Sequence, residues 1–359
     1  MFMPDSADKR ELTFAQAINE ATHQAMGADP SVICFGLGVT DPGAIFGTTK
    51  GLEEAFGSTR VFDMPTAENA MTGVAVGAAL AGLKPIMTHQ RLDFFLLAMD
   101  QLVNSAAKWH YMFGGQFSVP ITIRLIIGRG WGQGPTHSQN LHAWFSHIPG
   151  LKVVMPATPR DAKELLLASI DDPNPVLFLE HRWLHNISDH VPESPTRGEI
   201  GKARLIREGS DITIVSSGLL TLEAITAADR LSSIGISCDV VDLRTLNPID
   251  WPTIINSVKK TGRLLAVDSG SITGSISGEI IAKTTSQCFK DLKSAPIRLA
   301  QPDVPEPTSF GLTTNFHIRA SSIISAVGEV VHKSVESLIP HQVTDIKHDV
   351  PGLWFKGPF

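Results

Sequence analysis

Cysteine is scarce in this sequence, with three residues among 359: Cys34, Cys238 and Cys288. They lie far apart and match no zinc-binding or redox spacing. A disulfide framework is therefore excluded, and a reduced, cytoplasmic compartment fits best. Cys34 and Cys238 stand in apolar, strand-like runs, where we expect them to be small core residues.

Long apolar runs and an excess of positive charge are also missing. No run approaches the eighteen apolar residues of a membrane-spanning helix, so we expect no membrane association. The start, MFMPDSADKRELTF, lacks the basic and apolar regions of a signal peptide. The net charge of −6 provides no basic field, which argues against nucleic acid as a partner. The thirteen histidines do not cluster at metal-ligand spacings.

What is present is an alternation of helical and strand-like segments along most of the chain. With 43% hydrophobic residues and 359 residues in all, two domains are expected. Strands that are separated by helices predict an α/β fold of two tandem domains, with mainly parallel sheets flanked by helices. Periodicity is lost over residues 182–201. The predicted parts are a first domain, a linker, a second domain and a tail: 1–190, 191–205, 206–340 and 341–359.

Two helix starts are marked by capping residues. Thr13 and Gln16 form a plausible capping box at the start of LTFAQAINEATHQAM. Thr158 can cap a second helix whose first position is Pro159. A third segment, residues 93–112, predicts one long helix after the strand KPIMTH.

Glu68 is the first candidate functional residue. It lies in MPTAENAMTG, at a strand-to-helix junction that opens an almost wholly apolar helix. A carboxylate there is either a first-turn acid that favours the helix dipole or a group held in a dry site for chemistry. The residues alone leave both interpretations open.

The glycine-rich stretch GRGWGQGP, residues 128–135, follows a predicted strand. It lacks the Lys-Ser/Thr ending of a P-loop and the spacing of a dinucleotide fingerprint, so phosphate binding is not favoured. His137 comes just after it, at the carboxyl end of a parallel strand, where ligands gather in α/β sheets. Ser138 is not part of a G-x-S-x-G nucleophile elbow.

The stretch HQRLDFF, residues 89–95, also follows a predicted strand. Asp93 is expected to cap the next helix, and Phe94 by itself reads as a core residue. Arg91 stands out, because a cation at the carboxyl end of a strand needs a partner or an anionic ligand.

Several stretches, in collinear order, carry a resemblance to one family. They include TKGLEEAFGSTRVFDMPTAENAMTGVAVGAALAGLKPI, THSQNLHAWFSHIPGLKVVMPATPRDAKELL, NPVLFLEHRWL and VVDLRTLNPID. The chain resembles the β subunits of the thiamin-diphosphate-dependent 2-oxoacid dehydrogenases, the pyruvate, branched-chain and acetoin group of transketolase-like enzymes. This resemblance implies a pyrimidine-binding domain followed by a transketolase C-terminal domain.

The resemblance also implies roles for individual residues. Glu68 matches the glutamate that hydrogen-bonds the aminopyrimidine ring of thiamin diphosphate, and a carboxylate in an apolar setting suits proton sharing with that ring. Phe94 matches the aromatic residue that packs against the ring, and His137 matches a histidine near the reacting substrate. The implied activity is oxidative decarboxylation of a 2-oxoacid with acyl transfer to lipoyl groups. A potassium ion is implied at four positions: Ile121, Ile170, Asp172 and Asn174.

One family element is missing from the sequence. In complete transketolases a Gly-Asp-Gly segment, followed by Asn, holds the cofactor's diphosphate through Mg²⁺, and this sequence contains no Gly-Asp-Gly. The resemblance therefore implies an α subunit that holds the diphosphate and Mg²⁺. It further implies an assembly of two α and two β chains, with a lipoyl acyltransferase as a further partner.

Two departures from the family pattern concern the site. Leu37 stands where the family usually has a glutamate that is linked to proton communication between paired sites. His89 and Arg91 bring polar and cationic groups near the pocket. Our hypothesis is that they contact the substrate or acceptor and favour one with an anionic group.

Two other functions remain open at this point. The first is a related two-chain thiamin enzyme, a carboligase that joins an activated aldehyde to an acceptor carbonyl. The second is a non-catalytic flavin-binding α/β module, for which Glu68 would be dispensable. The presence of Glu68, Phe94 and His137 together favours the enzyme.

Overall fold

The computed structural model describes residues 10–339 except 131, and residues 348–352, 354, 355 and 357. Most of the segment considered for a targeting signal, and part of the predicted tail 341–359, lie outside the described residues. The chain divides into two compact units, which are described separately: unit 1, Met1–Gly128 and Thr136–Ile200, and unit 2, Arg129–Pro135 and Gly201–Phe359.

Unit 1 is built on a parallel sheet, in which the strands follow the order β6-β7-β5-β4-β2-β3. The strands are β2 Val32–Gly36, β3 Val61–Asp63, β4 Lys84–His89, β5 Thr122–Ile127, β6 Lys152–Val154 and β7 Val176–His181. A separate antiparallel pair joins β1 (Glu11–Thr13) to β8 (Ser188–His190) and was not predicted. All six residues of β5 and of β7 are buried, as expected for central parallel strands.

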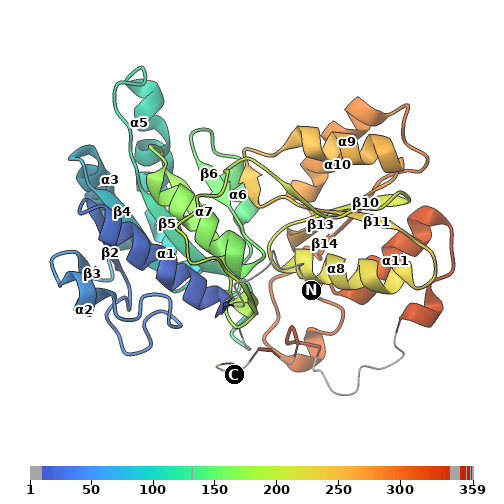
Figure 1. Ribbon diagram of the computed structural model, residues 1–359, viewed down its shortest axis with the longest axis horizontal. Helices are drawn as coiled ribbons and strands as arrows, with labels where there is room; N and C mark the ends of the chain where they lie inside the picture. The colour runs from blue at the N-terminus through green and yellow to red at the C-terminus, as the bar shows by residue number, and fades with distance from the viewer. Residues whose placement is uncertain (1–9, 131, 340–347, 353, 356, 358–359) are drawn as a thin grey trace. The chain divides into compact units, whose positions relative to one another are not determined.

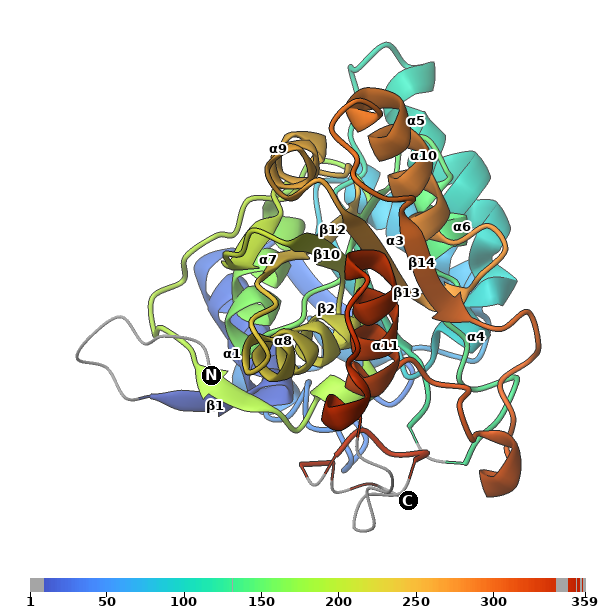
Figure 2. The same ribbon diagram turned by 90° about the vertical axis from the view of Figure 1, so that its right-hand side faces the viewer.

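Helices cover both faces of this sheet. Helices α1 and α7 lie on one face, and α3 and α5 lie on the other (Figures 1 and 2). The helical segments are α1 Phe14–Ala28, α2 Leu52–Phe56, α3 Glu68–Leu80, α4 Leu92–Phe95, η1 Leu96–Ala98, η2 Gln101–Ala106, α5 Ala107–Met112, α6 His142–Ser146, α7 Pro159–Asp171 and η3 Arg182–Leu184.

Both predicted helix starts are confirmed. Thr13 caps α1 in a reciprocal capping box with Gln16. The hydroxyl of Thr158 accepts a hydrogen bond from the backbone N–H of Asp161 at 3.0 Å, and Pro159 occupies the first position of α7. These hydrogen bonds satisfy backbone N–H groups in the first turn, which an uncapped helix would leave unpaired.

The predicted long helix over residues 93–112 is helical but is not one α-helix. It consists of the short helix α4, the 3₁₀ turn η1, the π-helical turn η2 and helix α5. A π turn shifts which residues face the sheet, so the buried side chains are not spaced by a single period of 3.6 residues. The sequence pattern could not show this change.

Unit 2 contains a second mainly parallel sheet, in the order β14-β13-β10-β11-β9, with only β9 antiparallel to its neighbour among these strands. Strand β9 begins inside the predicted linker 191–205. The strands are β9 Arg204–Arg207, β10 Ile212–Ser216, β11 Cys238–Asp242, β13 Leu264–Ser271 and β14 Ile297–Gln301, with a further short strand β12 Thr245–Asn247. The helical segments are α8 Leu219–Ser232, α9 Trp251–Thr261, α10 Ile276–Cys288, η4 Phe310–Leu312, α11 Ala320–Val331 and η5 Glu336–Leu338.

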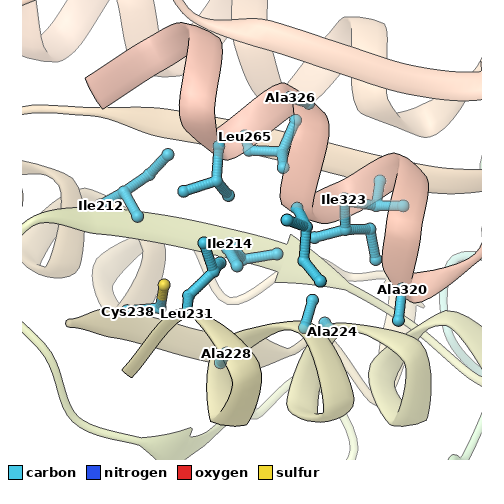
Figure 3. Packing of buried hydrophobic residues seen from close by; sticks show 14 of the residues in the cluster. Ile212, Ile214, Ala224, Ala228, Leu231, Cys238, Leu265, Ala320, Ile323 and Ala326 are labelled. Carbon is cyan, nitrogen blue, oxygen red and sulfur yellow. The ribbon is translucent and has the colours of Figure 1, made fainter. Parts of the chain in front are cut away.

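The core of unit 2 lies between its sheet and the helices α8 and α11 (Figure 3). Ile214 and Leu265 from the sheet pack with Leu231 of α8 and Ile323 of α11, and all four are fully buried. Each such side chain contributes about 1.5–3 kcal/mol on burial. Cys238 belongs to this cluster, so its predicted place in the core is confirmed.

The described residues include no helix that is both long and apolar enough to cross a membrane.

Candidate functional site

The candidate site lies at the carboxyl edge of the unit 1 sheet. Because β4, β5 and β7 are parallel neighbours, the segments that follow these strands leave the sheet at the same edge. Such edges bind ligands in open α/β sheets. Within unit 1 these segments are 90–95 after β4, Gly128 and 136–142 after β5, and 182–185 after β7.

Glu68 is the first residue of α3 and only 5% of it is exposed. No side chain caps this helix at Ala67. Thr72, one turn later, donates a hydrogen bond from its hydroxyl to the carbonyl oxygen of Glu68 at 2.8 Å, and the same hydroxyl lies 3.5 Å from Sδ of Met87 on β4. Glu68 is therefore both a first-turn acid and a buried carboxylate beside the central sheet.

Phe94 and His137 are brought together by the fold. Their rings meet edge to face, with centroids 5.4 Å apart and planes at 87°. Both residues are half-buried, and Nδ1 of His137 lies 3.0 Å from the Thr136 hydroxyl. Gln139 fixes this arrangement, because its side-chain amide donates to Asp93 at 2.7 Å. Asp93 thus links the two segments. The capping role predicted for it is wrong, because α4 begins at Leu92 with Arg91 as its N-cap residue, and Asp93 lies inside the first turn.

The four predicted potassium positions lie elsewhere, near the amino ends of β5 and β7. Ile121 precedes β5, and its carbonyl oxygen accepts a hydrogen bond from Val176 N–H at 3.0 Å. Asp172 is the C-cap residue that follows α7. One of its carboxylate oxygens accepts a hydrogen bond from the backbone N–H of Asn174, and Lys152 forms an ion pair with the other. A potassium ion there would need backbone oxygens, including that of Ile170, because this carboxylate already holds an ammonium group.

His89 is fully buried at the end of β4, with its ring centroid 4.9 Å from that of Phe95. Among the described residues, neither ring nitrogen of His89 has a hydrogen-bond partner. Burial lowers its pKa to about 3, so the ring is neutral at physiological pH.

Arg91 is 3% exposed and donates a hydrogen bond from Nη1 to the carbonyl oxygen of Gly128 at 2.8 Å. Burial lowers its pKa to about 10, although the nearby Asp93 carboxylate acts in the opposite direction. A cation at the carboxyl end of a strand was predicted to need a partner or an anionic ligand. The backbone carbonyl of Gly128 is one such partner for Arg91.

A charged cluster around the end of β7 was not predicted from the sequence. Arg124 and Glu180 form a fully buried ion pair, and His185 Nε2 lies 3.3 Å from the second oxygen of Glu180. Arg182 is 3% exposed, with its guanidinium 4.1 Å from the centroid of the Phe46 ring. The signal was available in LEHRWLH, where two ionisable residues end the strand β7 and two more follow it.

Phe46 belongs to a loop with unusual backbone geometry. Ala44, Ile45 and Phe46 have φ values of 42°, 45° and 59°, the left-handed region that non-glycine residues rarely adopt. Such strain costs on the order of 1–3 kcal/mol per residue and is typical of functional sites.

Leu37, which stands where the family usually has a glutamate, follows β2 and donates its backbone N–H to the carbonyl oxygen of Thr88.

The comparisons with known proteins identify the family. Residues 10–186 match the transketolase pyrimidine binding domain, and residues 201–323 match the transketolase C-terminal domain. The chain is 41% identical to the pyruvate dehydrogenase E1 component subunit beta of Rhizobium meliloti (strain 1021), over 92% of this chain and 72% of the relative. It belongs to the family of 2-oxoacid dehydrogenase β subunits.

Other members of this family are similarly close. The acetoin:2,6-dichlorophenolindophenol oxidoreductase subunit beta of Cupriavidus necator is 40% identical over 88% of this chain and 96% of the relative. The 2-oxoisovalerate dehydrogenase subunit beta of Bacillus subtilis (strain 168) is also 40% identical, over 89% of this chain and 98% of the relative. The predicted family is therefore confirmed.

A solved structure has the same fold. The split gene transketolase, described as an inactive beta4 tetramer, superposes with a TM-score of 0.71 and 23% identity, over 89% of this chain and 98% of that one. Together with the domain matches, this likeness confirms the predicted two-domain α/β fold of the transketolase type. As a member of this thiamin-diphosphate-dependent family, the chain is expected to use that cofactor.

Proposed function

We propose that this chain is the β subunit of a thiamin-diphosphate-dependent 2-oxoacid dehydrogenase that requires an α subunit. It would decarboxylate a 2-oxoacid oxidatively and transfer the acyl group to a lipoyl group. The observation that carries the proposal is the buried Glu68 carboxylate at the first position of α3, in a chain that belongs to this family.

The residues present fit the pyrimidine half of the cofactor. Glu68 would accept a hydrogen bond from the pyrimidine ring, and Phe94 would pack against it. The bound cofactor supplies a carbon nucleophile that can hold the electrons released when carbon dioxide leaves. Glu68 would hold and return the ring proton, and its burial keeps water from competing for that proton. His137, edge to face with Phe94, would exchange a proton with the substrate oxygen.

The other half of the site would come from a partner. Because this sequence has no Gly-Asp-Gly segment, we propose that an α subunit holds the diphosphate and Mg²⁺, in an assembly of two α and two β chains. A lipoyl acyltransferase would receive the acyl group. Potassium at the backbone of residues 121 and 170–174 and a cytoplasmic location are further parts of this proposal.

Dehydrogenase subunits among the relatives at about 40% identity favour this function over the carboligase alternative. A dehydrogenase β subunit accounts for these matches more simply than a carboligase or a flavin-binding module does. The carboligase nevertheless makes a distinct prediction, cofactor binding without decarboxylation of simple 2-oxoacids, which the following experiment includes.

The test is reconstitution with a candidate α chain, thiamin diphosphate and Mg²⁺. Carbon dioxide release from pyruvate and branched-chain 2-oxoacids is measured for wild type and for Glu68→Gln, with Glu54→Gln as a control at an exposed acid on α2. We expect activity that needs both chains and falls about 10²- to 10⁴-fold in Glu68→Gln alone. Full activity of Glu68→Gln would refute the role of Glu68, and cofactor binding without decarboxylation would favour the carboligase.

A further inference from the structure

The segment between β5 and His137 is rich in glycine. It reads GRGWGQGP over residues 128–135, with glycine at every second position. Glycine gives a chain more conformations than any other residue, so such a segment is ordered only where other contacts hold it. The chain leaves unit 1 after Gly128 and returns to it at Thr136, and Arg129–Pro135 belong to unit 2. The contacts that hold this segment are therefore contacts within unit 2.

Arg129 anchors the segment. This residue is 1% exposed, and its Nη1 donates a hydrogen bond to the carbonyl oxygen of Pro307 at 2.8 Å. Two carboxylates neutralise the buried guanidinium group. Asp349 Oδ2 accepts a hydrogen bond from Nη2 at 3.3 Å, and Glu306 Oε1 lies 3.7 Å from Nη1. Moving Arg129 out of this position would separate buried opposite charges, which is strongly unfavourable.

Gly134 provides a second contact at the other end of the segment. Its φ is 76°, and a Cβ at this position would lie 2.0 Å from Oγ1 of Thr308. The absence of a side chain thus lets the backbone approach Thr308, which follows the Pro307 carbonyl bound by Arg129. Both ends of the segment are held against residues 306–308.

His137 follows this anchored segment directly, with only Thr136 between them. On the carboxyl side of His137, Gln139 is fixed to Asp93 by a hydrogen bond of 2.7 Å. On the amino side, the nearest charged anchor along the chain is Arg129. The backbone of the histidine is thus restrained from both directions, and Arg129 supplies one of the two restraints.

We propose that Arg129 is a positioning residue for His137. By anchoring the segment 129–135, it holds the histidine where a proton can be exchanged with the substrate oxygen. This inference rests on the proposed function and adds a residue that touches neither cofactor nor substrate. A general acid or base must lie within hydrogen-bond reach of the atom it serves, and a displacement of about 1 Å can slow a reaction about 10²-fold. Release of a glycine-rich segment would permit such a displacement.

The kinetic test is a double-mutant cycle of Arg129→Gln and His137→Ala in the reconstituted complex. We expect Arg129→Gln to lower kcat roughly 10- to 100-fold and to change the Kd for thiamin diphosphate less than about twofold. In the His137→Ala background the same substitution should change kcat less than about twofold, because the positioned group is gone. Arg129→Lys should restore part of the rate. Arg298→Gln, at an exposed arginine of unit 2 that also donates to a backbone carbonyl, should keep the wild-type rate.

Thermal unfolding separates positioning from loss of the fold. Arg129→Gln removes a charge from beside the buried Glu306, so it is paired with a milder variant, Asp349→Asn, at the more exposed of the two carboxylates. Asp349→Asn should lower kcat by a smaller factor at an unchanged melting temperature. Rate losses confined to variants with a lower melting temperature would show a purely structural role and overturn the inference.

Chemical modification tests the inference without any turnover. Diethyl pyrocarbonate acylates accessible histidine rings, and mass spectrometry measures the rate at His137 relative to the exposed His147 of the same molecule. We expect a several-fold faster relative rate in Arg129→Gln, because the half-buried ring of His137 is no longer held in place. That result supports the inference even if no 2-oxoacid is decarboxylated, an outcome that would refute the proposed function alone. An unchanged relative rate, or kinetic effects of Arg129→Gln and His137→Ala that multiply, would overturn the inference.

Discussion

Arg124 on β5 and Glu180 on β7 form a two-pronged ion pair in which both side chains are fully buried. Nε of the arginine donates to one carboxylate oxygen at 2.6 Å, and Nη2 donates to the other at 3.0 Å. This pair connects two central strands directly beneath the edge that carries the candidate site.

Glu180→Gln should destabilise the protein by about 3–5 kcal/mol, because it leaves the Arg124 charge buried without its carboxylate. Urea unfolding at pH 7 measures this loss. Glu54→Gln, on the surface, should change stability by less than about 0.5 kcal/mol. Equal free energies of unfolding for Glu180→Gln and Glu54→Gln would show that the buried ion pair does not contribute to stability.

The same pair predicts acid sensitivity. Burial alone would raise the pKa of Glu180, but the charge of Arg124 and the hydrogen bonds from His185 and Arg124 lower it to about 2. Because the folded-state pKa lies below the ordinary value, the stabilisation is present above pH 4.5 and is lost as pH falls toward 2. Unfolding free energies between pH 6 and pH 3 should decrease less steeply in Glu180→Gln than in wild type.

His89 should make the protein sensitive to milder acid. Its pKa is lowered by burial to about 3, so the folded state binds the proton more weakly than the unfolded chain does. The stabilisation is present above pH 6.5, and about 2 kcal/mol of it is lost by pH 5. His89→Leu should remove this decrease, and His147→Leu, at an exposed position, should keep it. Parallel pH profiles for wild type and His89→Leu would contradict the prediction.

Gly128 should not tolerate a side chain. Its φ of 73° is unfavourable for other residues, and a Cβ would collide with the ring of His181. Gly128→Ala should therefore cost about 2 kcal/mol or more. Gly27→Ala, in α1 where nothing lies within 4 Å of the added Cβ, should instead stabilise the protein by about 0.5–1 kcal/mol. Thermal or urea unfolding of both variants tests whether stability falls in Gly128→Ala and rises in Gly27→Ala.

Phe94 should contribute to cofactor affinity. Phe94→Leu removes an aromatic contact worth about 0.5–1.5 kcal/mol, so the Kd for thiamin diphosphate of the reconstituted complex should rise roughly 2- to 13-fold. Calorimetry measures this change, with Phe289→Leu as a control at an exposed aromatic residue of unit 2. An unchanged Kd would show that Phe94 does not pack against the cofactor.

Local signals in the sequence predicted local structure well. Thr13 with Gln16, and Thr158 with Pro159, mark helix starts because their hydrogen bonds and fixed dihedral angles act within one turn. The short antiparallel strands β1, β8 and β9 were missed, because their few residues carry no clear alternation and their pairing partners lie far away in the chain.

The sequence by itself determined the family, the alternation of strands and helices, and the position of Glu68 at the start of an apolar helix, since each depends on residues close together in the chain. Only the tertiary structure decided which distant residues meet. It paired Phe94 with His137 and buried His89 against Phe95. These contacts arise because parallel strands with long crossover connections bring their carboxyl ends to one edge, and strand order is a property of the whole sheet.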